Sequence, residues 1–281
     1  MKYFALTNDP DHGKTEDYRK ILKELAKNSI FVTTAVFCKI KEDESLLSKH
    51  CHKGDTDTLD IKEYRELMLE AKDLGHEIAF HGYSQVSDTR DEFQKGLDIF
   101  NDIFGEYPKV YFEHGGHPKS HNKEMIKKEN LAMYGSDTSS EYYIRDIVKN
   151  VFNVVWTHDY LRDELKEPLP LDNIFDPKDG LLYLNRWRMY DFIDIRDAID
   201  HQKNTIVGYT HFGYRGYKRS GRNILLNAYS NYINKNAYYE RWLSVRDMNR
   251  SIKGIRDFIV ENNVKSVVIS ELYDIYIRSA P

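Results

Sequence analysis

One stretch decides how this chain is interpreted: Gly75-His76-Glu77-Ile78-Ala79-Phe80-His81-Gly82-Tyr83-Ser84-Gln85. The apolar residues 78–80 predict a buried strand that delivers His81 to its carboxyl end. Imidazole is a common metal ligand, so a histidine at a strand end is a candidate functional residue. Four residues later, where a metal site would use a second histidine, the chain has Gln85. An amide oxygen is a weak, neutral ligand compared with imidazole.

Strands and helices alternate on both sides of this stretch. Alternation predicts a parallel sheet with outer helices, and at least seven strands favour a barrel over a doubly wound sheet. We expect one domain over residues 1–281, with a basic loop insertion around 212–245. The predicted strands are 2–8, 30–37, 77–81, 109–113, 132–136, 181–184, 205–209 and 264–270, and the predicted helices are 15–28, 60–74, 90–104, 121–130 and 247–262.

Composition narrows the class of protein. The 281 residues are 41% hydrophobic and 31% charged, which suits a packed core and a polar surface. A formal net charge of −4 gives no reason to expect nucleic acid. No apolar run approaches the roughly 18 residues of a membrane span. The short N-terminal strand leaves no room for a signal peptide, so we expect a cytoplasmic protein.

Polar residues follow several of the predicted strands. These residues are Asp9, His81, His114, Asp137 and His211. Parallel strands end at one edge of a sheet, and sites in such folds lie at that edge. We therefore expect these side chains to lie together at the carboxyl-terminal opening of the barrel.

Two carboxylates, Asp9 and Asp11, follow the first strand. One could ligate a metal while the other stays free as a base. An Asp-Pro turn followed by a helix cap would explain the same residues without any chemistry.

Three histidines in eight residues follow the strand at 109–113. They are His114, His117 and His121, in a glycine-rich segment. Either His114 or His117 could complete a metal shell in place of the missing histidine, or orient the base. A surface loop is the alternative.

Basic and aromatic residues supply candidates for substrate contact. The segment 213–222 holds four cations, including Arg215 and Arg219, next to His211. Arginine forks and glycine-rich backbone both suit phosphate, although a solvated loop explains a charge run equally well. In Arg186-Trp187-Arg188, Trp187 could stack on a sugar ring.

The motifs resemble those of the NodB-homology polysaccharide deacetylases, in the family's order over roughly residues 3–270. Residues 75–85 resemble the second motif, G-H-E-I-x-N-H-[ST]-x-x-H, apart from Gln85 at its last position. Residues 6–11 resemble the first motif, T-F-D-D, and residues 207–211 the fifth, L-x-H. Asp137 lies in a segment that resembles a recurrent Y-D-S-S stretch. The third motif, R-x-P-x-G, is matched poorly by residues 113–118.

The resemblance implies a distorted (β/α) barrel that binds a divalent metal, commonly zinc, and removes N- or O-acyl groups from sugars. It implies Asp9 as the base and Asp11 as a metal ligand. The two aspartates are adjacent in the family motif but separated by one residue here, so their two roles could be exchanged. It further implies His81 as a ligand and His211 as the general acid. Gln85 would be at most a weak ligand.

Two other interpretations stay open. One is a metal-independent hydrolase of cyclic amides, similar to the allantoinases of the same fold. The other is a carbohydrate-binding relative without catalysis. For the enzyme, a cytoplasmic setting favours a phosphate-bearing sugar intermediate of glycan biosynthesis as substrate.

Overall fold

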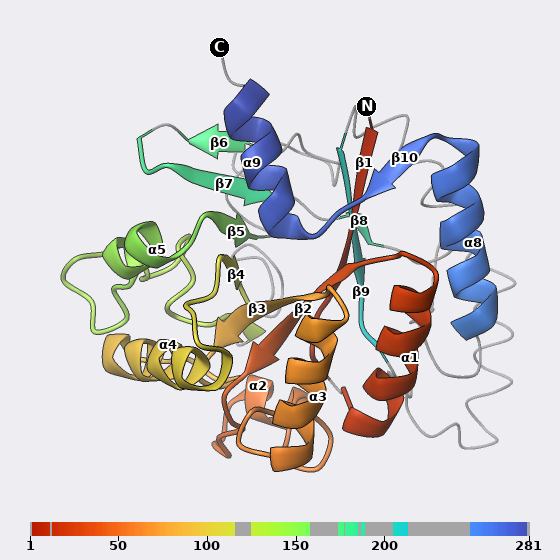
Figure 1. The fold of residues 1–281 in the computed structure, drawn as a ribbon. Helices are drawn as coiled ribbons and strands as arrows, with labels where there is room; N and C mark the ends of the chain where they lie inside the picture. Colours follow the sequence, from red (N-terminus) through yellow and green to blue (C-terminus); the bar gives the residue numbers. More distant parts are fainter. Residues whose placement is uncertain are drawn as a thin grey trace, which may run out of the picture.

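A curled, mostly parallel sheet with helices on its outer side forms the centre of the fold (Figure 1). The computed structural model describes residues 2–11, 13–115, 125–157, 174–176, 178–184, 187–188, 205–212 and 248–279. The strands are β1 Lys2–Asn8, β2 Val32–Phe37, β3 Glu77–Gly82, β4 Val110–Phe112, β5 Val154–Trp156, β6 Ile174–Asp176, β7 Leu181–Leu184, β8 Trp187–Arg188, β9 Thr205–Thr210 and β10 Val264–Ser266. The helices are α1 Thr15–Lys27, α2 Leu46–His50, α3 Lys62–Asp73, α4 Arg90–Phe104, α5 Arg145–Val151, α8 Met248–Glu261 and α9 Ile269–Ser279.

The order of the strands confirms the predicted distorted (β/α) barrel. The sheet runs β6-β7-β5-β4-β3-β2-β1-β9-β8, and β10 also pairs with β1. Every described pairing is parallel except β6 with β7. The carboxyl ends of β1, β3, β4 and β9 therefore meet at one edge, as expected for a site in this fold class.

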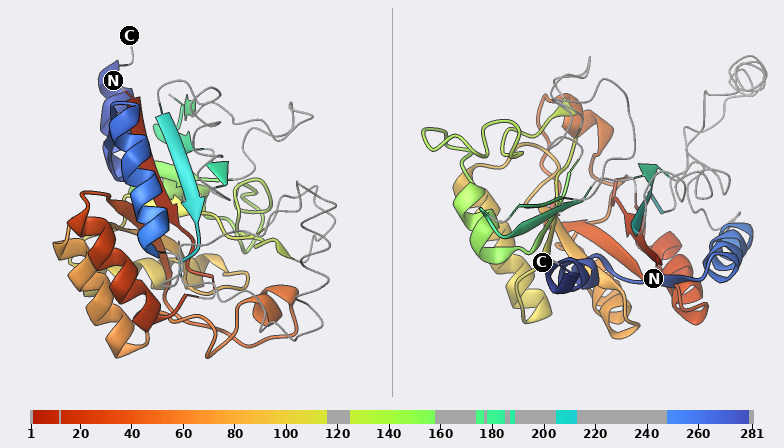
Figure 2. Two further views of the ribbon diagram at one scale, coloured as in Figure 1. Left: turned by 90° about the vertical axis from the view of Figure 1, so that its right-hand side faces the viewer. Right: turned by 90° about the horizontal axis from the view of Figure 1, so that it is seen from above.

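Alternation along the strands divides the core into two layers. Outward residues such as Leu6 and Phe80 pack against the helices, and α1, α3, α4 and α8 cover this face of the sheet (Figure 2). Inward residues such as Ala5, Ala35 and Ala79 form a second cluster inside the curl. Successive strand residues point to opposite faces, so one hydrophobic run fills both layers.

Helix α9 begins at the opposite edge of the sheet from the carboxyl ends. Its Ser270 N–H donates to the carboxylate of Glu77, the first residue of β3, at 3.1 Å. Leu272 of α9 packs into the inner cluster. The predicted strand at 264–270 is therefore shorter than expected and gives way to this helix.

The segment after β4 differs most from the sequence prediction. Residues 125–130 do not form the helix expected at 121–130, and residues 132–136 form turns instead of a strand. The reason is tertiary, because Lys127 and Asn130 bury polar side chains that bond to other segments. Local periodicity does not detect such contacts.

Within the described residues, no helix is both long and apolar enough to cross a membrane.

A candidate metal centre at the carboxyl ends of the strands

Four buried side chains converge at the carboxyl edge of the sheet: Asp9, Asp11, His81 and His114. One potential ligand atom from each lies within 4.8 Å of the others. His81 Nε2 is 3.2 Å from Asp9 Oδ1 and 3.0 Å from His114 Nδ1, and His114 Nδ1 is 3.6 Å from Asp11 Oδ1. All four are at most 5% exposed. We refer to these four residues as the Asp-His cluster.

His81 is oriented by a main-chain carbonyl of the neighbouring strand. Its Nδ1 lies 2.8 Å from the carbonyl oxygen of Phe112, which can only accept a hydrogen bond. Nδ1 therefore carries the proton, and Nε2 presents its lone pair to the cluster. The ring of Phe37 packs against the imidazoles of His81 and His114, with centroid distances of 4.5 and 5.1 Å.

His114 is held through its main chain. The side-chain amide of Asn130 donates to the carbonyl oxygen of His114 at 2.8 Å. Gly115, with φ of 99°, forms a bridge to Ile126. A Cβ on Gly115 would lie 2.2 Å from the carbonyl oxygen of Met125, so glycine is required for this close approach. Segment 125–131 thus fixes His114, a role that the sequence did not reveal.

His211 faces both aspartates from the end of β9. Its Nε2 lies 3.6 Å from Asp9 Oδ2 and 4.0 Å from Asp11 Oδ2. Asn8 helps to place it, because its Oδ1 accepts from the Phe212 N–H at 2.7 Å while its Nδ2 donates to Thr34 and Tyr18. Asn8 therefore links β1, β2, β9 and α1 beside the site, and sequence reasoning missed it.

The donor set of the Asp-His cluster fits a divalent metal ion. Two carboxylates and two imidazoles are the ligands that zinc and similar ions accept. The hydrogen bond from His81 Nδ1 to a carbonyl is the outer support that ligating histidines usually have. The predicted ligands Asp11, His81 and His114 are brought together here, and Asp9 and His211 lie beside them.

Gln85 lies outside this group. Its Oε1 accepts from the main-chain N–H of Lys41 at 2.9 Å, and its Nε2 donates to the Lys41 carbonyl at 2.5 Å. Gln85, which stands where the family motif has its second histidine, therefore holds the loop after β2 in place. His114, which follows the next strand β4, lies with the Asp-His cluster instead.

Of the remaining predicted site residues, the structure describes Asp137 and the backbone of Trp187. Asp137 is exposed and accepts from the N–H and hydroxyl of Ser139, whose hydroxyl lowers the pKa of Asp137. Trp187 lies in β8, next to β9. His117, Arg186, Arg215 and Arg219 lie outside the described residues, as does most of the predicted basic insertion at 212–245.

A buried ion cluster lies next to Phe37, the residue that packs on the imidazoles of the site. The ammonium of Lys127 lies 3.0 Å from Asp88 Oδ2, 2.8 Å from Glu129 Oε1 and 2.8 Å from the carbonyl oxygen of Ser84. Lys127, Asp88 and Glu129 have no exposed surface. Burial alone would lower the pKa of Lys127, but its two carboxylate partners raise it. Burial raises the pKa of Glu129 to about 7 against the pull of Lys127.

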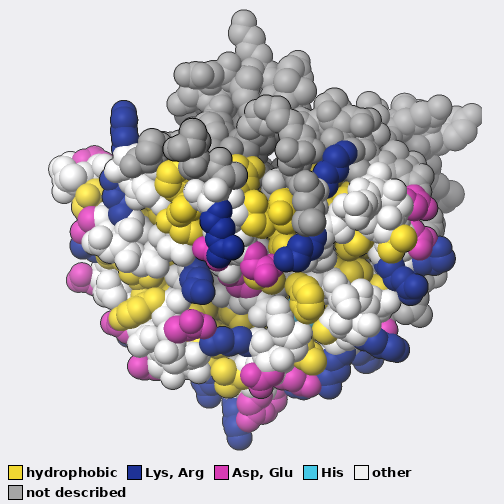
Figure 3. Space-filling model, turned by 45° about the horizontal axis from the view of Figure 1, so that its top comes forward, with side chains coloured by type: hydrophobic (Ala, Val, Ile, Leu, Met, Phe, Trp, Pro, Cys, Tyr) yellow, Lys and Arg dark blue, Asp and Glu magenta, His cyan; other side chains and the backbone are white. Residues whose placement is uncertain are grey.

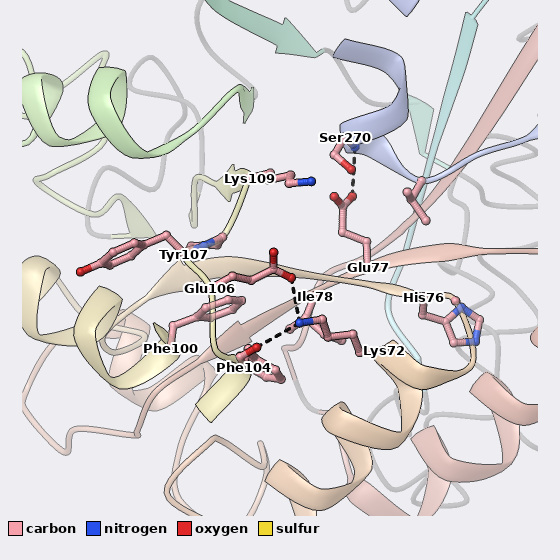
Figure 4. A pocket seen from close by; sticks show the side chains of 13 residues that line it. Lys72, His76, Glu77, Ile78, Phe100, Phe104, Glu106, Tyr107, Lys109 and Ser270 are labelled. Carbon is pink, nitrogen blue, oxygen red and sulfur yellow. Dashed lines mark hydrogen bonds and ion pairs between the residues drawn. The ribbon is translucent and has the colours of Figure 1, made fainter. Parts of the chain in front are cut away.

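A small cavity lies at the other edge of the sheet, under α9. It has a volume of about 180 Å³ and is lined by charged side chains that largely pair among themselves (Figure 4). Lys72 contacts Glu106 at 2.7 Å, and Glu77 accepts from Ser270. The upper side of the molecule mixes both signs of charge (Figure 3). The charged side chains of this cavity therefore have a structural role, and the Asp-His cluster is the candidate functional site.

Comparisons with known proteins return structures of similar fold. No family model and no curated protein matches the chain. A polysaccharide deacetylase from Bacillus cereus is 13% identical, with 95% of this chain and 92% of that chain covered and a TM-score of 0.46. A family 4 acetyl xylan esterase from Clostridium thermocellum, in complex with a cobalt ion, is 11% identical, with 98% of this chain and 91% of that chain covered and a TM-score of 0.46. An allantoinase is 12% identical, with 90% of this chain and 88% of that chain covered and a TM-score of 0.44.

These three structures share 11–13% identity with this chain, at TM-scores of 0.44–0.46. At such identities and TM-scores, they carry no information on the substrate or activity of this chain. The class that the molecule itself defines is a distorted (β/α) barrel with a candidate metal centre at the carboxyl ends of its strands. Its function is argued from that centre.

Proposed function

We propose that the protein is a metal-dependent hydrolase that removes an N- or O-acyl group from a sugar or a glycan intermediate. The convergence of the Asp-His cluster, with His211 within 4.0 Å of both carboxylates, carries this proposal. Acyl transfer to water needs an activated nucleophile, a base and an acid. These five side chains include candidates for all three needs.

Asp11, His81 and His114 would hold the ion, with zinc the favoured metal. A divalent ion bound there supplies Lewis acidity towards the acyl carbonyl and activates water for attack. The carbonyl of Phe112 keeps His81 in the tautomer that a ligand needs, and Asn130 keeps the main chain of His114 in place.

Asp9 would act as the base and His211 as the acid. The two oxygens of Asp9 face different imidazoles, Oδ1 towards His81 and Oδ2 towards His211. A carboxylate at this position can take the proton of an attacking water molecule. His211, at the opposite side of the same carboxylate, can then protonate the departing amine or alcohol. An unperturbed imidazole, with a pKa of about 6.5, suits that role at neutral pH.

The test is release of acyl groups from a panel of N-acetyl and O-acetyl sugars, with metal content measured on the same samples. We expect release that stops on chelation and returns when zinc is added. Asp11→Asn should lose the metal, whereas Asp9→Asn should keep the metal and lose turnover. A fully metal-loaded protein that releases no acyl group from any member of the panel would contradict the proposal.

One observation favours a second candidate, a metal-independent cyclic-amide hydrolase. The 3.0 Å separation of His81 Nε2 and His114 Nδ1 suits a direct hydrogen bond between the rings, which a metal-free site would use. Ring opening of a cyclic amide that persists after exhaustive chelation would support this candidate. A carbohydrate-binding protein without catalysis would show ligand binding unchanged by Asp9→Asn or His211→Ala, and no turnover.

A further inference from the structure

The loop after β2 is fastened along the residues that follow β3. The N–H of Cys38 donates to the carbonyl of Gly82 at 3.3 Å, and that of Lys39 donates to the carbonyl of Tyr83 at 3.0 Å. Gln85 adds its two bonds to the main chain of Lys41. The pairing of β2 and β3 therefore continues past both strands, and it fixes the positions of the two lysines that the loop carries.

Three ammonium groups surround one aromatic ring at this place. Nζ atoms of Lys39, Lys41 and Lys95 lie 4.8, 5.4 and 5.4 Å from the ring centroid of Tyr83. Lys95 comes from α4, which packs on β3. The ring is only 4% exposed and is therefore fixed in place. A contact of one cation with a ring is favourable, but three like charges around one ring also repel one another.

Among the described residues, only one of the three cations forms an ion pair with a carboxylate. Lys41 contacts Glu92 at 2.6 Å and Asp88 at 3.7 Å. Among the described residues, no carboxylate oxygen lies within 4.0 Å of the ammonium nitrogen of Lys39 or of Lys95. Both ammonium groups instead lie close to the ring of Tyr83. Interaction with Lys39, and then with Lys95, lowers the pKa of this phenol. Interaction with Tyr83 likewise raises the pKa of Lys39.

We propose that Lys39, Lys41, Lys95 and Tyr83 form an oxyanion-binding site, which takes a phosphate or carboxylate group. An oxyanion between Lys39 and Lys95 would relieve their repulsion and accept charge-assisted hydrogen bonds from both ammonium groups. Lysine binds phosphate as a point charge, so convergent ammonium groups suit it without the fork geometry of arginine. We name these four residues the lysine site.

The lysine site lies at the same edge of the sheet as the Asp-His cluster, towards α4. Phe37 packs on the imidazoles of the cluster, and Lys39 follows it by two residues. The two sites are chemically separate, because the lysine site contains none of the cluster residues. The proposal therefore does not rest on the proposed acyl hydrolysis, and either could fail without the other.

The test is calorimetric titration of the full chain with inorganic phosphate at low ionic strength, since exposed charges are screened by salt. We expect Lys39→Met with Lys95→Met to weaken phosphate binding by about tenfold or more. Lys62→Met with Lys149→Met removes the same charge from α3 and α5, and should leave binding unchanged. Thermal unfolding of both double variants checks that they fold.

A metal ion can also bind phosphate, so the Asp11→Asn variant is titrated in parallel. Binding that persists in Asp11→Asn and is lost in Lys39→Met with Lys95→Met supports the lysine site. Binding that is lost in Asp11→Asn, that falls equally in the two double-lysine variants, or that is undetectable in the unmodified protein overturns it.

The source of the oxyanion is decided by a second pair of probes, glucose 6-phosphate and glucose. Glucose 6-phosphate that binds more tightly than inorganic phosphate, with the excess lost in the Lys39→Met and Lys95→Met variant, identifies a larger phosphorylated ligand. Equal affinities identify phosphate alone. Glucose itself, which lacks the charge, should not bind to the lysine site.

Discussion

Nδ1 of His114 lies 3.0 Å from Nε2 of His81, although the two residues come from different strands and are 33 positions apart. In the neutral ring of His81, Nδ1 donates to the carbonyl oxygen of Phe112 and Nε2 is the nitrogen that can act as a ligand. His114 thus provides a second imidazole at the place where the sequence pattern loses one at Gln85. Metal binding in this protein should depend on His114 and be largely independent of Gln85.

The first prediction contrasts these two residues. His114→Ala removes a ligand, so zinc affinity should fall by more than the roughly 10–100-fold that loss of a supporting residue costs. Gln85→Ala should leave the affinity nearly unchanged, since among the described residues its amide bonds only to Lys41. Competition titration with a zinc chelator measures both. Equal losses in the two variants would show that Gln85 acts at the metal after all.

The second prediction concerns proton donation by His211. His211→Ala should keep the metal and lower hydrolysis of an N-acetyl sugar by about 10²–10⁴-fold. An activated aryl acetate should lose far less, because its leaving group departs without a proton. The measurement is kcat for both substrates in both proteins. A uniform loss across leaving groups would assign His211 a role in binding instead.

The third prediction tests the buried ion cluster. Lys127→Met leaves Glu129 buried without its cation and Asp88 with only Lys41 at 3.7 Å among the described residues, so unfolding free energy should fall by about 3–5 kcal/mol. Lys128 is the matched control, since its side chain is exposed and, among the interactions described, its ammonium group bonds only to the hydroxyl of Tyr142. Lys128→Met should change stability by about 0.5 kcal/mol or less. Urea denaturation distinguishes the two, and similar losses would contradict a special role for Lys127.

The fourth prediction uses two glycines with positive φ. Gly82, with φ of 134°, follows His81, and a Cβ there would lie 2.3 Å from Nζ of Lys127. Gly82→Ala should therefore cost about 3 kcal/mol or more. Gly54, with φ of 85°, has open space around it, so Gly54→Ala should cost only about 1 kcal/mol of backbone strain. Equal costs in denaturation would mean that Lys127 moves aside freely.

The fifth prediction concerns pH. Burial raises the pKa of Glu129 to about 7, against about 4.3 in an unfolded chain. Between these values the folded state holds a proton that the unfolded state has released. The contribution of Glu129 to stability is thus present below about pH 4.3 and is lost as pH rises through about 7.

Glu129→Gln stays neutral at every pH and should flatten this decline. The difference in slope between the two proteins should approach 1.4 kcal/mol per pH unit at most, the value for one proton, at about 25 °C. Denaturation curves at several pH values across this window measure it. Parallel curves would show that Glu129 is ionised in the folded protein throughout.

The sequence predicted the barrel because its strands and helices alternate clearly. α4 is an example, because Thr89 and Glu92 form a capping box and Gly105 ends the helix at φ of 74°, which gives the predicted bounds 90–104. Asp9, Asp11, His81, His114 and His211 were also predicted as site residues, since each follows a strand. Topology alone then brings strand ends to one edge.

The sequence could not predict which side chains would turn away from that edge. Gln85 bonds to a main chain 44 residues earlier, and nothing near it in the sequence indicates this partner. Asn130 and Lys127 lie in a segment whose pattern suggested a helix, and their buried contacts explain why none forms. Long-range polar bonds override local propensity, and a single sequence does not record them.

Strand β1 pairs on one side with β9, and on the other with β2 and β10. The bond from Phe212 to Asn8 spans 204 positions. At about 5–20 residues per second, a ribosome needs roughly 10–40 s to make that intervening chain. During this interval the edge of β1 that pairs with β9 has no partner, and Asp9 and Asp11 have been made whereas His211 has not. This connectivity leaves an open strand edge during synthesis, so we expect any need for chaperones to be greatest before residue 212 emerges.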